Sequence, residues 1–499
     1  MEINMDDRIK RITEMEARLD RITAWLEDPS GDVREDVRLL DEYYRGPLWR
    51  SDFEADEAGE LPADLPRGVL SEDAVYNALS DYEEQNRDRA AKRGETMREW
   101  TIGQISILEN RASARSELPA LFGPGGARAA RAFHAQLEGY EKTPLVSLPH
   151  LAEKLNVSGV YCKDESKRFS LNAFKGLGGS YAMFRILCER LGLDPERTSL
   201  RALTEGEHRE AVSKLEFVTC TDGNHGKGVS WAAGLFGCRA HVYMPCGSQE
   251  VRAEAIRRAG PADVEITDLS YDDAVRYAGE MSRRHGWILI QDTAWDGYET
   301  IPAWIIQGYL TMAAETAEEL DRLQVRPTHL FLQAGVGAMA GGVLSFFTAL
   351  YGGRKPVTAI VEPTAADCVY RSAKAGAPRS VEGAPATIMA GLNCGTPCGI
   401  TWPVLRDYAE FSVAGPDEMA AAGMRAYAHG LDGDPRIVSG ESGAATLGAA
   451  QAILGDPAFS EVKEAMGFDA RSVLLLISTE GDTDPENYRR IVAGDHPLA

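Results

Sequence analysis

The first hundred or so positions place apolar side chains at the spacing of amphipathic helices, with charged residues between them. After two such stripes comes an acidic, proline-marked stretch, and then Ser71, a good helix N-cap with Glu72 and Asp73 in the first turn. We therefore expect a small all-α domain over residues 1–95, whose last stretch, from Glu83, is a charged helix that continues into a linker. The apolar positions of the first two stripes are Ile9, Ile12, Met15, Leu19, Ile22, Leu26, Val33, Val37, Leu40 and Tyr44.

From about Trp100 onward, short apolar runs alternate with stretches of helical periodicity. Apolar runs without polar alternation are typical of parallel strands that are covered on both faces. Strands that alternate with helices indicate an α/β fold with parallel sheets, in which ligands bind at the carboxyl ends of the strands. The runs that we expect to be strands are residues 159–165, 217–220, 240–244, 287–291, 329–333, 357–361 and 473–477.

The length of 499 residues exceeds what one compact core supports, so two to four domains are expected. We place the helical domain at residues 1–95, a linker and lead-in segment at 96–130, and the main α/β domain at 131–499. With 44% hydrophobic and 26% charged residues, the composition is that of a soluble globular protein.

The formal net charge of −23 restricts the possible partners. It argues against binding to nucleic acid, which needs a basic face, and against docking on anionic membranes. No segment has the length and apolarity of a membrane span, and the first twenty residues lack the apolar core of a signal peptide. We therefore expect a cytoplasmic protein that contacts neither nucleic acid nor membrane.

The eight cysteines are scattered, and none forms a CxxC pair, so neither a structural zinc site nor another metal site is expected. Cys394 and Cys398 are four residues apart, but Gly395 and Pro397 argue against a helix there. We expect most of the thiols to be buried, and the sequence leaves a redox pair open.

One lysine, Lys175, stands in the otherwise uncharged, glycine-closed stretch SLNAFKGLGGSYA, residues 170–182. A lysine kept away from water loses part of its preference for the ammonium form, because desolvation disfavours charge. A neutral amine can attack an aldehyde and hold it as a Schiff base. Taken alone, Lys175 is equally well explained as an exposed lysine at the start of an ordinary helix, so its neighbours must decide.

Three further turns each follow an expected strand. TDGNHG (221–226) opens a helix with small residues, QAGVGAMAGG (333–342) is rich in glycine, and STEGDTD (478–484) comes last. Backbone N–H groups and the helix dipole at a glycine-rich helix start suit a phosphate, although close strand–helix packing also selects glycine. A Schiff-base lysine beside a phosphate cradle points to pyridoxal phosphate, an aldehyde cofactor that acts as an electron sink.

In this order the pieces resemble the fold-type II family of pyridoxal phosphate enzymes, which includes the tryptophan synthase β-subunit and the threonine and serine dehydratases. Over roughly Trp100 to Val492, they are most similar to the diaminopropionate ammonia-lyases. The resemblance implies two parallel-sheet α/β subdomains and a homodimer, whereas residues 1–95 resemble a small acidic bacterial domain of unknown function. The blocks that carry it are KDESKRFSLNAFKGLGGSYA, TDGNHGKGVSWAA, HVYMPCGS, QDTAWDGY, VEPTAADCVYRSA, TIMAGLNCGTP, DPRIVSGESGA and LLISTEGDTD.

Carried over by position, the resemblance implies roles for the residues of these turns. Lys175 is the Schiff-base lysine, and Asn224 hydrogen-bonds the ring hydroxyl oxygen of the cofactor. Either Ser478 or Thr479 faces the pyridine nitrogen, where a neutral hydroxyl partner leaves the ring unprotonated and so favours elimination. The phosphate-binding loop comprises Gly335, Val336, Gly337, Ala338, Met339 and Gly341.

Asp222 departs from the related dehydratases, which usually have a small residue in an SxGNH turn where this chain has TDGNH. A carboxylate there can act as a base on the substrate or hold a cationic amine. The alternative is an ordinary N-cap or turn aspartate. The family also places Asp292 and Tyr271 near the substrate, and Asp292 is suited to pair with a second amine, although a structural role would explain either residue. We take Lys175, Asp222 and Asp292 as catalytic candidates.

Three neighbouring residues receive other assignments. His225 is expected to be a structural residue at a helix start rather than a base, and Glu441 is expected at a helix start near the site. Ser170 stands where family members commonly have glycine, so that its hydroxymethyl group could touch the floor of the site.

The resemblance implies a carbon–nitrogen lyase that converts a small amino acid, 2,3-diaminopropionate in its L- and D-forms, to pyruvate and two ammonia by α,β-elimination. One alternative is a dehydratase of serine or threonine, or a lyase acting on another β-substituted amino acid. Asp222 argues against the dehydratase, since a hydroxyl leaving group needs no carboxylate to hold a second ammonium. The other alternative is a non-catalytic scaffold whose helical module binds a partner, against which the intact Lys175 and Asn224 argue.

Overall fold

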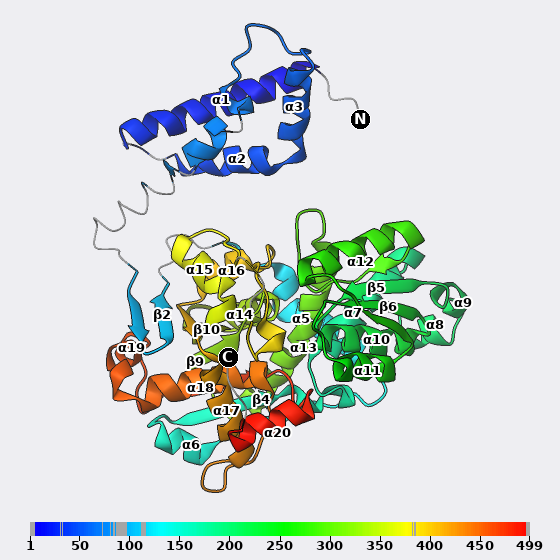
Figure 1. Cartoon of the computed structure of the whole chain (residues 1–499), viewed down its shortest axis with the longest axis vertical. Helices are drawn as coiled ribbons and strands as arrows, with labels where there is room; N and C mark the ends of the chain where they lie inside the picture. The colour runs from blue at the N-terminus through cyan, green and yellow to red at the C-terminus, as the bar shows by residue number, and fades with distance from the viewer. Residues whose placement is uncertain are drawn as a thin grey trace. The chain divides into compact units, whose positions relative to one another are not determined.

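The computed structural model describes residues 5–29, 31, 33–71, 73–79, 81–82, 85, 97–110, 116–381, 383 and 386–495. The chain divides into two compact units, Met1–Thr96 and Met97–Ala499, and each is described by itself (Figure 1).

The first unit is helical, as its apolar stripes predict. Ile12, Leu19 and Ile22 of the first stripe are buried, and Leu40 of the second packs into the same core. Burying one stripe of each helix against the others is what an amphipathic helix requires for stability. The helices are α1 (Met5–Glu27), α2 (Arg34–Arg45), α3 (Pro47–Glu57), η1 (Gly68–Leu70) and a helical stretch at 73–79.

Ser71 fulfils the capping role predicted for it, because its Oγ accepts a hydrogen bond from the N–H of Ala74 at 3.3 Å. Glu72 and most of the charged stretch that follows residue 82 lie outside the described residues.

The second unit contains a larger, mixed sheet. Its strands are β1 (Glu99–Ile102), β2 (Ile105–Glu109), β3 (Leu145–Ser147), β4 (Gly159–Asp164), β9 (His329–Gln333), β10 (Val357–Pro363), β11 (Phe411–Gly415) and β12 (Val473–Ser478). Their order is β1-β2-β11-β10-β9-β12-β4-β3, and the five central strands are parallel. The edge strands β1, β2 and β3 pair antiparallel, which the expectation of purely parallel sheets did not include.

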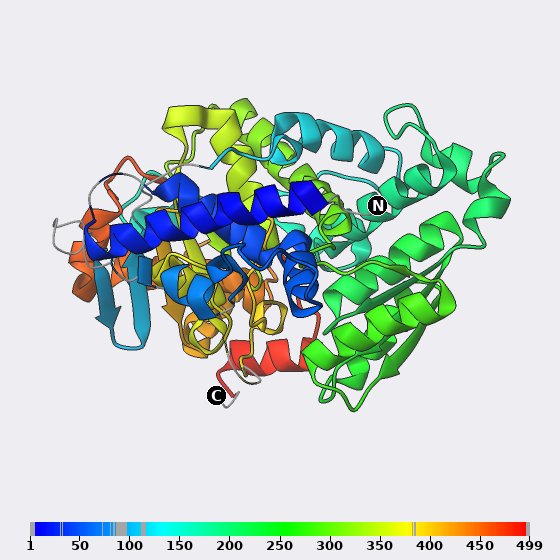
Figure 2. The ribbon, with the colours of Figure 1, turned by 90° about the horizontal axis from the view of Figure 1, so that it is seen from above.

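A smaller sheet lies beside the larger one, in the green part of the chain (Figures 1 and 2). Its order is β7-β6-β5-β8 and all its pairs are parallel. The seven runs predicted to be strands all contain strands of these two sheets, so the α/β fold with parallel sheets is confirmed. The strands of the smaller sheet are β5 (Glu216–Cys220), β6 (Arg239–Met244), β7 (Ala262–Ile266) and β8 (Ile288–Leu289).

Helices cover both sheets, and the longest of them, α13, packs against α7, α5 and α14 in the core between them. The helices are α5 (Pro124–His134), α6 (Pro149–Lys154), α7 (Lys175–Leu191), α8 (Leu200–Thr204), α9 (Arg209–Val212), α10 (Asn224–Phe236), α11 (Glu250–Ala259), α12 (Tyr271–His285), α13 (Thr300–Arg322), α14 (Ala338–Tyr351), α15 (Cys368–Ala375), α16 (Trp402–Tyr408), α17 (Asp417–His429), α18 (Glu441–Gly455), α19 (Ser460–Ala465) and α20 (Pro485–Ala493). Short 3₁₀ turns lie at η2 (Ala120–Phe122), η3 (Glu165–Ser170), η4 (Gly352–Arg354), η5 (Thr364–Ala366), η6 (Ala390–Leu392) and η7 (Pro457–Phe459).

The eight cysteines are free thiols. Six are buried, Cys394 is half-buried and Cys246 is exposed, which confirms that most are buried. The segment from Cys394 to Cys398 is not helical, as Gly395 and Pro397 predict.

The turn between β4 and α7 is strained. Phe169, Ser170 and Asn172 have φ values of 50°, 57° and 58°, in the left-handed region that side chains disfavour by roughly 1–2 kcal/mol per residue. Lys175 follows this turn as the first residue of α7. A strained backbone persists only where its surroundings determine it strongly.

A cluster of buried charges lies behind this turn. Glu315 of α13 accepts a hydrogen bond from Lys163 Nζ at 2.6 Å and from Arg168 Nη2 at 2.7 Å. Arg168 also binds Glu165 at 2.8 Å, and the four side chains are at most 1% exposed. The cluster therefore connects the strained turn to β4 on one side and to α13 on the other.

Replacing Glu315 by alanine is expected to lower the free energy of unfolding by about 3–5 kcal/mol, because Lys163 would lose its carboxylate partner inside the protein and Arg168 would keep only Glu165. Urea unfolding of the full chain, followed by circular dichroism, measures this. The matched control is Glu318→Ala on the same helix. Its ion pairs with Arg131 and Lys142 are half exposed, and their loss is expected to cost less than about 1 kcal/mol. Equal losses in the two variants would contradict the stabilising role of the cluster.

Candidate active site

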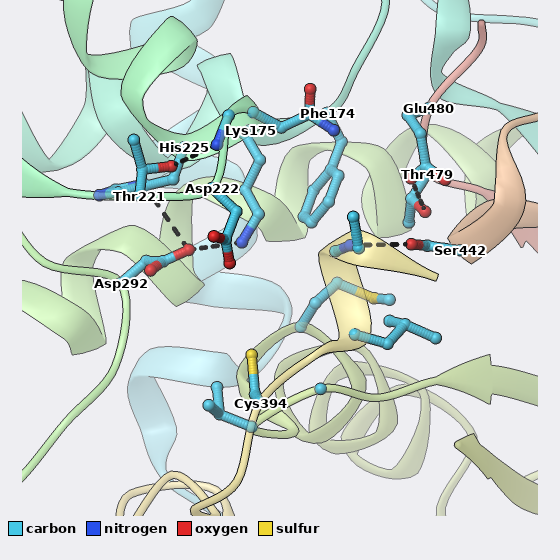
Figure 3. Close-up of a pocket in the computed structure, with 18 of the residues that line it drawn as sticks. Phe174, Lys175, Thr221, Asp222, His225, Asp292, Cys394, Ser442, Thr479 and Glu480 are labelled. Carbon is cyan, nitrogen blue, oxygen red and sulfur yellow. Dashed lines mark hydrogen bonds and ion pairs between the residues drawn. The ribbon is translucent and has the colours of Figure 1, made fainter. Parts of the chain in front are cut away.

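A cavity opens where strands of both sheets reach their carboxyl ends. Residues that follow β5, β8, β9 and β12 line it, as do Phe174 and Lys175 at the start of α7. The four turns predicted from the sequence therefore converge on one site, as the rule for parallel α/β sheets anticipates (Figure 3).

Lys175 and Asp292 form an ion pair in this cavity, with Nζ and Oδ2 2.5 Å apart (Figure 3). Burial opposes the charge on Lys175, yet Asp292 outweighs it and raises the pKa of the ammonium above its ordinary value. Burial likewise opposes the charge on Asp292, but His225 and Lys175 lower its pKa to about 2. Desolvation does disfavour the ammonium form of Lys175, as expected, but a carboxylate 117 positions along the chain outweighs it.

His225 is a structural residue in this arrangement. It is buried near the start of α10, and its Nε2 lies 2.8 Å from the carbonyl oxygen of Ile290. That distance assigns the proton of the neutral ring to Nε2, which donates to the carbonyl. Burial lowers the pKa of His225, and Asp292, whose Oδ2 lies 3.7 Å from the ring Nδ1, opposes this shift.

Asp222 lines the cavity at the turn between β5 and α10, close to Lys175 and Asp292 (Figure 3). The neighbouring Thr221 stabilises the turn, because its Oγ1 accepts hydrogen bonds from the N–H groups of Gly223 and Gly226. The N-cap residue of α10 is Gly223, which has no side chain, and Thr221 rather than Asp222 satisfies the N–H of Gly226 in the first turn. The interpretation of Asp222 as a helix cap is therefore not supported.

Burial raises the pKa of Asp222 to about 6, and the negative charge of Asp292 adds to this rise. Arg252 of α11 opposes it, since its guanidinium lines the same cavity and lies 3.4 Å from the carbonyl oxygen of Asp222. A carboxylate with this pKa is mostly ionised at pH 7 and can both accept and release a proton near neutrality.

Asn224 and Tyr271 also line the cavity, as the first residues of α10 and α12. Burial raises the pKa of Tyr271 well above its ordinary value, so the phenol remains neutral. Its hydroxyl lies 3.4 Å from Gln291 Nε2, which fixes its position beside the smaller sheet.

The glycine-rich loop lines the cavity from Gly335 to Ala340 and leads into α14. A Cβ at Gly335 would lie 3.1 Å from Cys394 Sγ, and Gly337 has a φ of 85°, so both positions favour glycine. Gly341, which was also predicted to bind the phosphate, does not line the cavity. Its Cα faces α16, where a Cβ would lie 2.4 Å from the Cβ of Thr401, so this glycine permits close helix packing instead.

The choice between Ser478 and Thr479 follows from their hydrogen bonds. Ser478 is fully buried, its hydroxyl donates to Ser439 Oγ at 2.7 Å, and it does not line the cavity. Thr479 does line it, and its hydroxyl contacts Gln333 and Glu480. Ser478 is the last residue of β12 and Thr479 the first residue after it, and of the two only Thr479 reaches the cavity.

Ser170 lies outside the site. Its side chain is exposed and does not line the cavity, and its φ of 57° explains why glycine suits this position. Conversely, sequence reasoning did not identify Gln333, Arg252, Lys227 and Glu480 as lining residues. Gln333 and Glu480 lie within the predicted turns 333–342 and 478–484, so their position in these motifs could have identified them. Glu441 does line the cavity, at the first position of α18, as expected.

The site can be compared with known proteins. A family described as "Pyridoxal-phosphate dependent enzyme" matches residues 137–462, and a "Domain of unknown function (DUF4298)" matches residues 1–88. The chain is 46% identical to the diaminopropionate ammonia-lyase of Escherichia coli (strain K12) over 398 residues, which cover 79% of this chain and 98% of that protein. The chain belongs to the diaminopropionate ammonia-lyase family of pyridoxal-phosphate dependent enzymes.

Solved structures agree with this family. The crystal structure of the Escherichia coli lyase in complex with D-serine matches with a TM-score of 0.74 and 45% identity, over 79% of this chain and 99% of that chain. The biosynthetic L-threonine dehydratase of Escherichia coli (strain K12) is more distant from this lyase-family chain, with 26% identity over 244 residues, 48% of this chain and 40% of that protein.

The residues of this ammonia-lyase family member fit the family's cofactor. Gly335 and Gly337 keep the loop free of side chains, and the first turn of α14 leaves backbone N–H groups without helical partners, which suits a phosphate. Gln333 Oε1 is buried at the cavity without a partner among the described residues, so an acceptor is available there. Lys175 supplies the amine for an aldehyde.

Proposed function

We propose that this chain is a diaminopropionate ammonia-lyase that converts 2,3-diaminopropionate, in its L- and D-forms, to pyruvate and two molecules of ammonia. The identity to the Escherichia coli lyase supports this, as does the similarity to its structure in complex with D-serine. The observation that carries the proposal is the placement of Asp222. Because Thr221 makes the hydrogen bonds of the turn, Asp222 leaves a carboxylate in the cavity that contains Lys175.

Pyridoxal phosphate, when bound, supplies an electron sink for the negative charge that develops at the substrate Cα. In this proposal Lys175 holds the aldehyde carbon of the cofactor, Asn224 the ring hydroxyl oxygen and Thr479 the ring nitrogen. The loop Gly335–Met339 holds the phosphate with the N–H groups at the start of α14. All of these residues line the cavity.

Two side chains take the Cα proton from opposite sides of the substrate. Lys175 Nζ accepts it from the L-isomer, and the carboxylate of Asp222 accepts it from the D-isomer. A positioned base of this kind contributes about 10²–10⁴-fold to the rate. Asp222 is suited to the task near neutral pH, since its pKa is about 6.

Asp292 serves both the lysine and the substrate in this proposal. Its contact with Lys175 Nζ holds a proton next to that nitrogen, and its carboxylate attracts the second ammonium group of the substrate. Serine and threonine lack this second ammonium, so the pair of carboxylates at Asp222 and Asp292 favours diaminopropionate. In this proposal Tyr271, which begins α12 after β7 of the smaller sheet, also contacts the substrate.

We further propose a homodimer in the cytoplasm, on the strength of the family resemblance. The net charge of −23 does not suit a nucleic-acid partner. None of the described helices is long and apolar enough to cross a membrane.

The substrate assignment is tested by measuring pyruvate release from L- and D-2,3-diaminopropionate, L-serine and L-threonine with the purified, pyridoxal phosphate-loaded protein. We expect kcat/KM for diaminopropionate to exceed that for either hydroxy amino acid by at least about 100-fold. The reason is that Asp222 and Asp292 both attract the second ammonium group, and each contribution of about 1.4 kcal/mol raises kcat/KM tenfold. Turnover confined to serine or threonine would contradict the assignment and make the protein a dehydratase.

The two-base arrangement is tested with Asp222→Asn. We expect kcat/KM for the D-isomer to fall by at least about 100-fold and that for the L-isomer by less than about tenfold, since only the D-reaction loses its base. In the unsubstituted protein the ratio of D- to L-activity is expected to fall as the pH drops through about 6, where Asp222 becomes protonated. In Asp222→Asn this ratio should not change with pH. Equal losses on both isomers would contradict the assignment of separate bases.

A further inference from the structure

A short chain of hydrogen bonds runs from Gln333 of β9 to the start of α18 along one wall of the cavity, and Figure 3 shows its members Thr479 and Glu480. Gln333 Nε2 donates to Thr479 Oγ1 at 3.0 Å, and Thr479 Oγ1 donates to Glu480 Oε2 at 2.6 Å. All three residues are buried and line the cavity. The chain therefore ends at a titratable group, and its middle member is a hydroxyl that lines the cavity.

The direction of the first bond is fixed. Gln333 Nε2 also donates to the carbonyl oxygen of Ile477 at 2.9 Å, and a carbonyl can only accept, so the amide cannot be flipped. Thr479 Oγ1 is thus an acceptor toward Gln333. A hydroxyl has a single proton, so what Thr479 offers to the cavity depends on Glu480 alone.

Glu480 is held firmly in place. Its Oε1 accepts a hydrogen bond from the N–H of Gly443 in the first turn of α18 at 2.7 Å, and its side chain is 6% exposed. The charged group that faces it is Glu441 on α18, which in turn is influenced by Arg252 and Asp484. Among the described residues, no cation forms an ion pair with Glu480.

We infer that Glu480 is a positioning residue that sets, through the Thr479 hydroxyl, whether the protein donates or accepts a hydrogen bond at the ring nitrogen of the cofactor. As a carboxylate, Glu480 accepts the proton of Thr479, which then presents only an oxygen lone pair to the ring nitrogen. As a carboxylic acid, Glu480 donates its proton to Thr479, whose own proton becomes free to point into the cavity. This inference rests on the proposed function, which places Thr479 at the ring nitrogen.

A consequence is that the hydrogen bond at the ring nitrogen follows the protonation of Glu480. When Glu480 holds its proton, the nitrogen receives a hydrogen bond from Thr479. When Glu480 releases its proton to solvent, Thr479 turns its proton to the carboxylate, and the nitrogen loses that hydrogen bond. Burial raises the pKa of Glu480 to about 7, and Glu441 adds to the rise while Thr479 and Gly443 oppose it, so this change falls near neutral pH.

A purely structural role for Glu480 is the alternative, since it also caps α18. Glu480→Gln separates the two roles. The amide oxygen still accepts from the N–H of Gly443, whereas the amide nitrogen can only donate to Thr479, which imitates the protonated acid at every pH. This variant therefore keeps the hydrogen bond that caps α18 and removes the dependence of the Thr479 hydroxyl on pH.

The experiment is a pH titration of the absorbance spectrum of the pyridoxal phosphate-loaded full chain without substrate, from pH 5.5 to 9. A hydrogen bond donated to the ring nitrogen changes the electron distribution of the ring, so the spectrum reports the titration of Glu480. We expect one transition in the unsubstituted protein with a midpoint near pH 7, and its loss in Glu480→Gln, which keeps the low-pH spectrum throughout. Glu441→Gln is the matched control. It removes a neighbouring carboxylate that bonds to Asn487 instead of Thr479, and it should keep the transition at a lower midpoint.

The inference is overturned if the unsubstituted protein shows no transition, or if Glu480→Gln shows the same one. Should Glu480→Gln fail to fold, two variants of Thr479 test the inference instead. Thr479→Ser keeps the hydroxyl and is expected to keep the transition. Thr479→Val lacks the hydroxyl and is expected to lose the transition. A transition that persists in Thr479→Val would contradict the relay. These spectra are independent of turnover, so failure of the protein to act on diaminopropionate would leave their result intact.

Discussion

The ion pair between Lys175 and Asp292 is the constraint on which the site depends. Lys175 begins α7 after a strained turn that leaves the larger sheet, and Asp292 follows β8 of the smaller sheet. The pair therefore joins segments of the chain that belong to different sheets. Both side chains are half-buried, and their ion pair holds the start of α7 close to the segment that follows β8 at the cavity.

The same pair explains how one cavity holds carboxyl groups of different proton affinity. Asp292 is bound to a lysine, and its pKa falls to about 2. Burial acts on Asp222 and Glu480 without a cation bonded to either carboxylate in the described chain, and their pKa values rise to about 6 and about 7. Such a spread is typical of sites that perform acid–base chemistry near neutral pH.

Sequence reasoning predicted the strands that have unbroken apolar runs, which are β4, β5, β6, β8, β9, β10 and β12, and the four turns that follow strand ends. It missed β7 and β11, whose sequences ADVEI and FSVAG are interrupted by polar residues or glycine. It also missed the antiparallel strands β1 to β3, which are three to five residues long and mostly half exposed. It grouped Gly341 with the loop that lines the cavity and left Ser478 and Thr479 as alternatives, since only tertiary packing decides which face a motif residue presents. The charge on Lys175 depends on Asp292, far away in the sequence, which no local pattern reveals.

The most direct test of the account asks which lysine carries the cofactor. Lys227 lines the same cavity, its Nζ donates to the carbonyl oxygen of Leu171 at 2.7 Å, and burial lowers its pKa, so it is the competing amine. The measurement is borohydride reduction of the pyridoxal phosphate-loaded protein, followed by peptide mapping with mass spectrometry. The account predicts the cofactor on Lys175 alone. Attachment to Lys227, or to no lysine of the cavity, would contradict it.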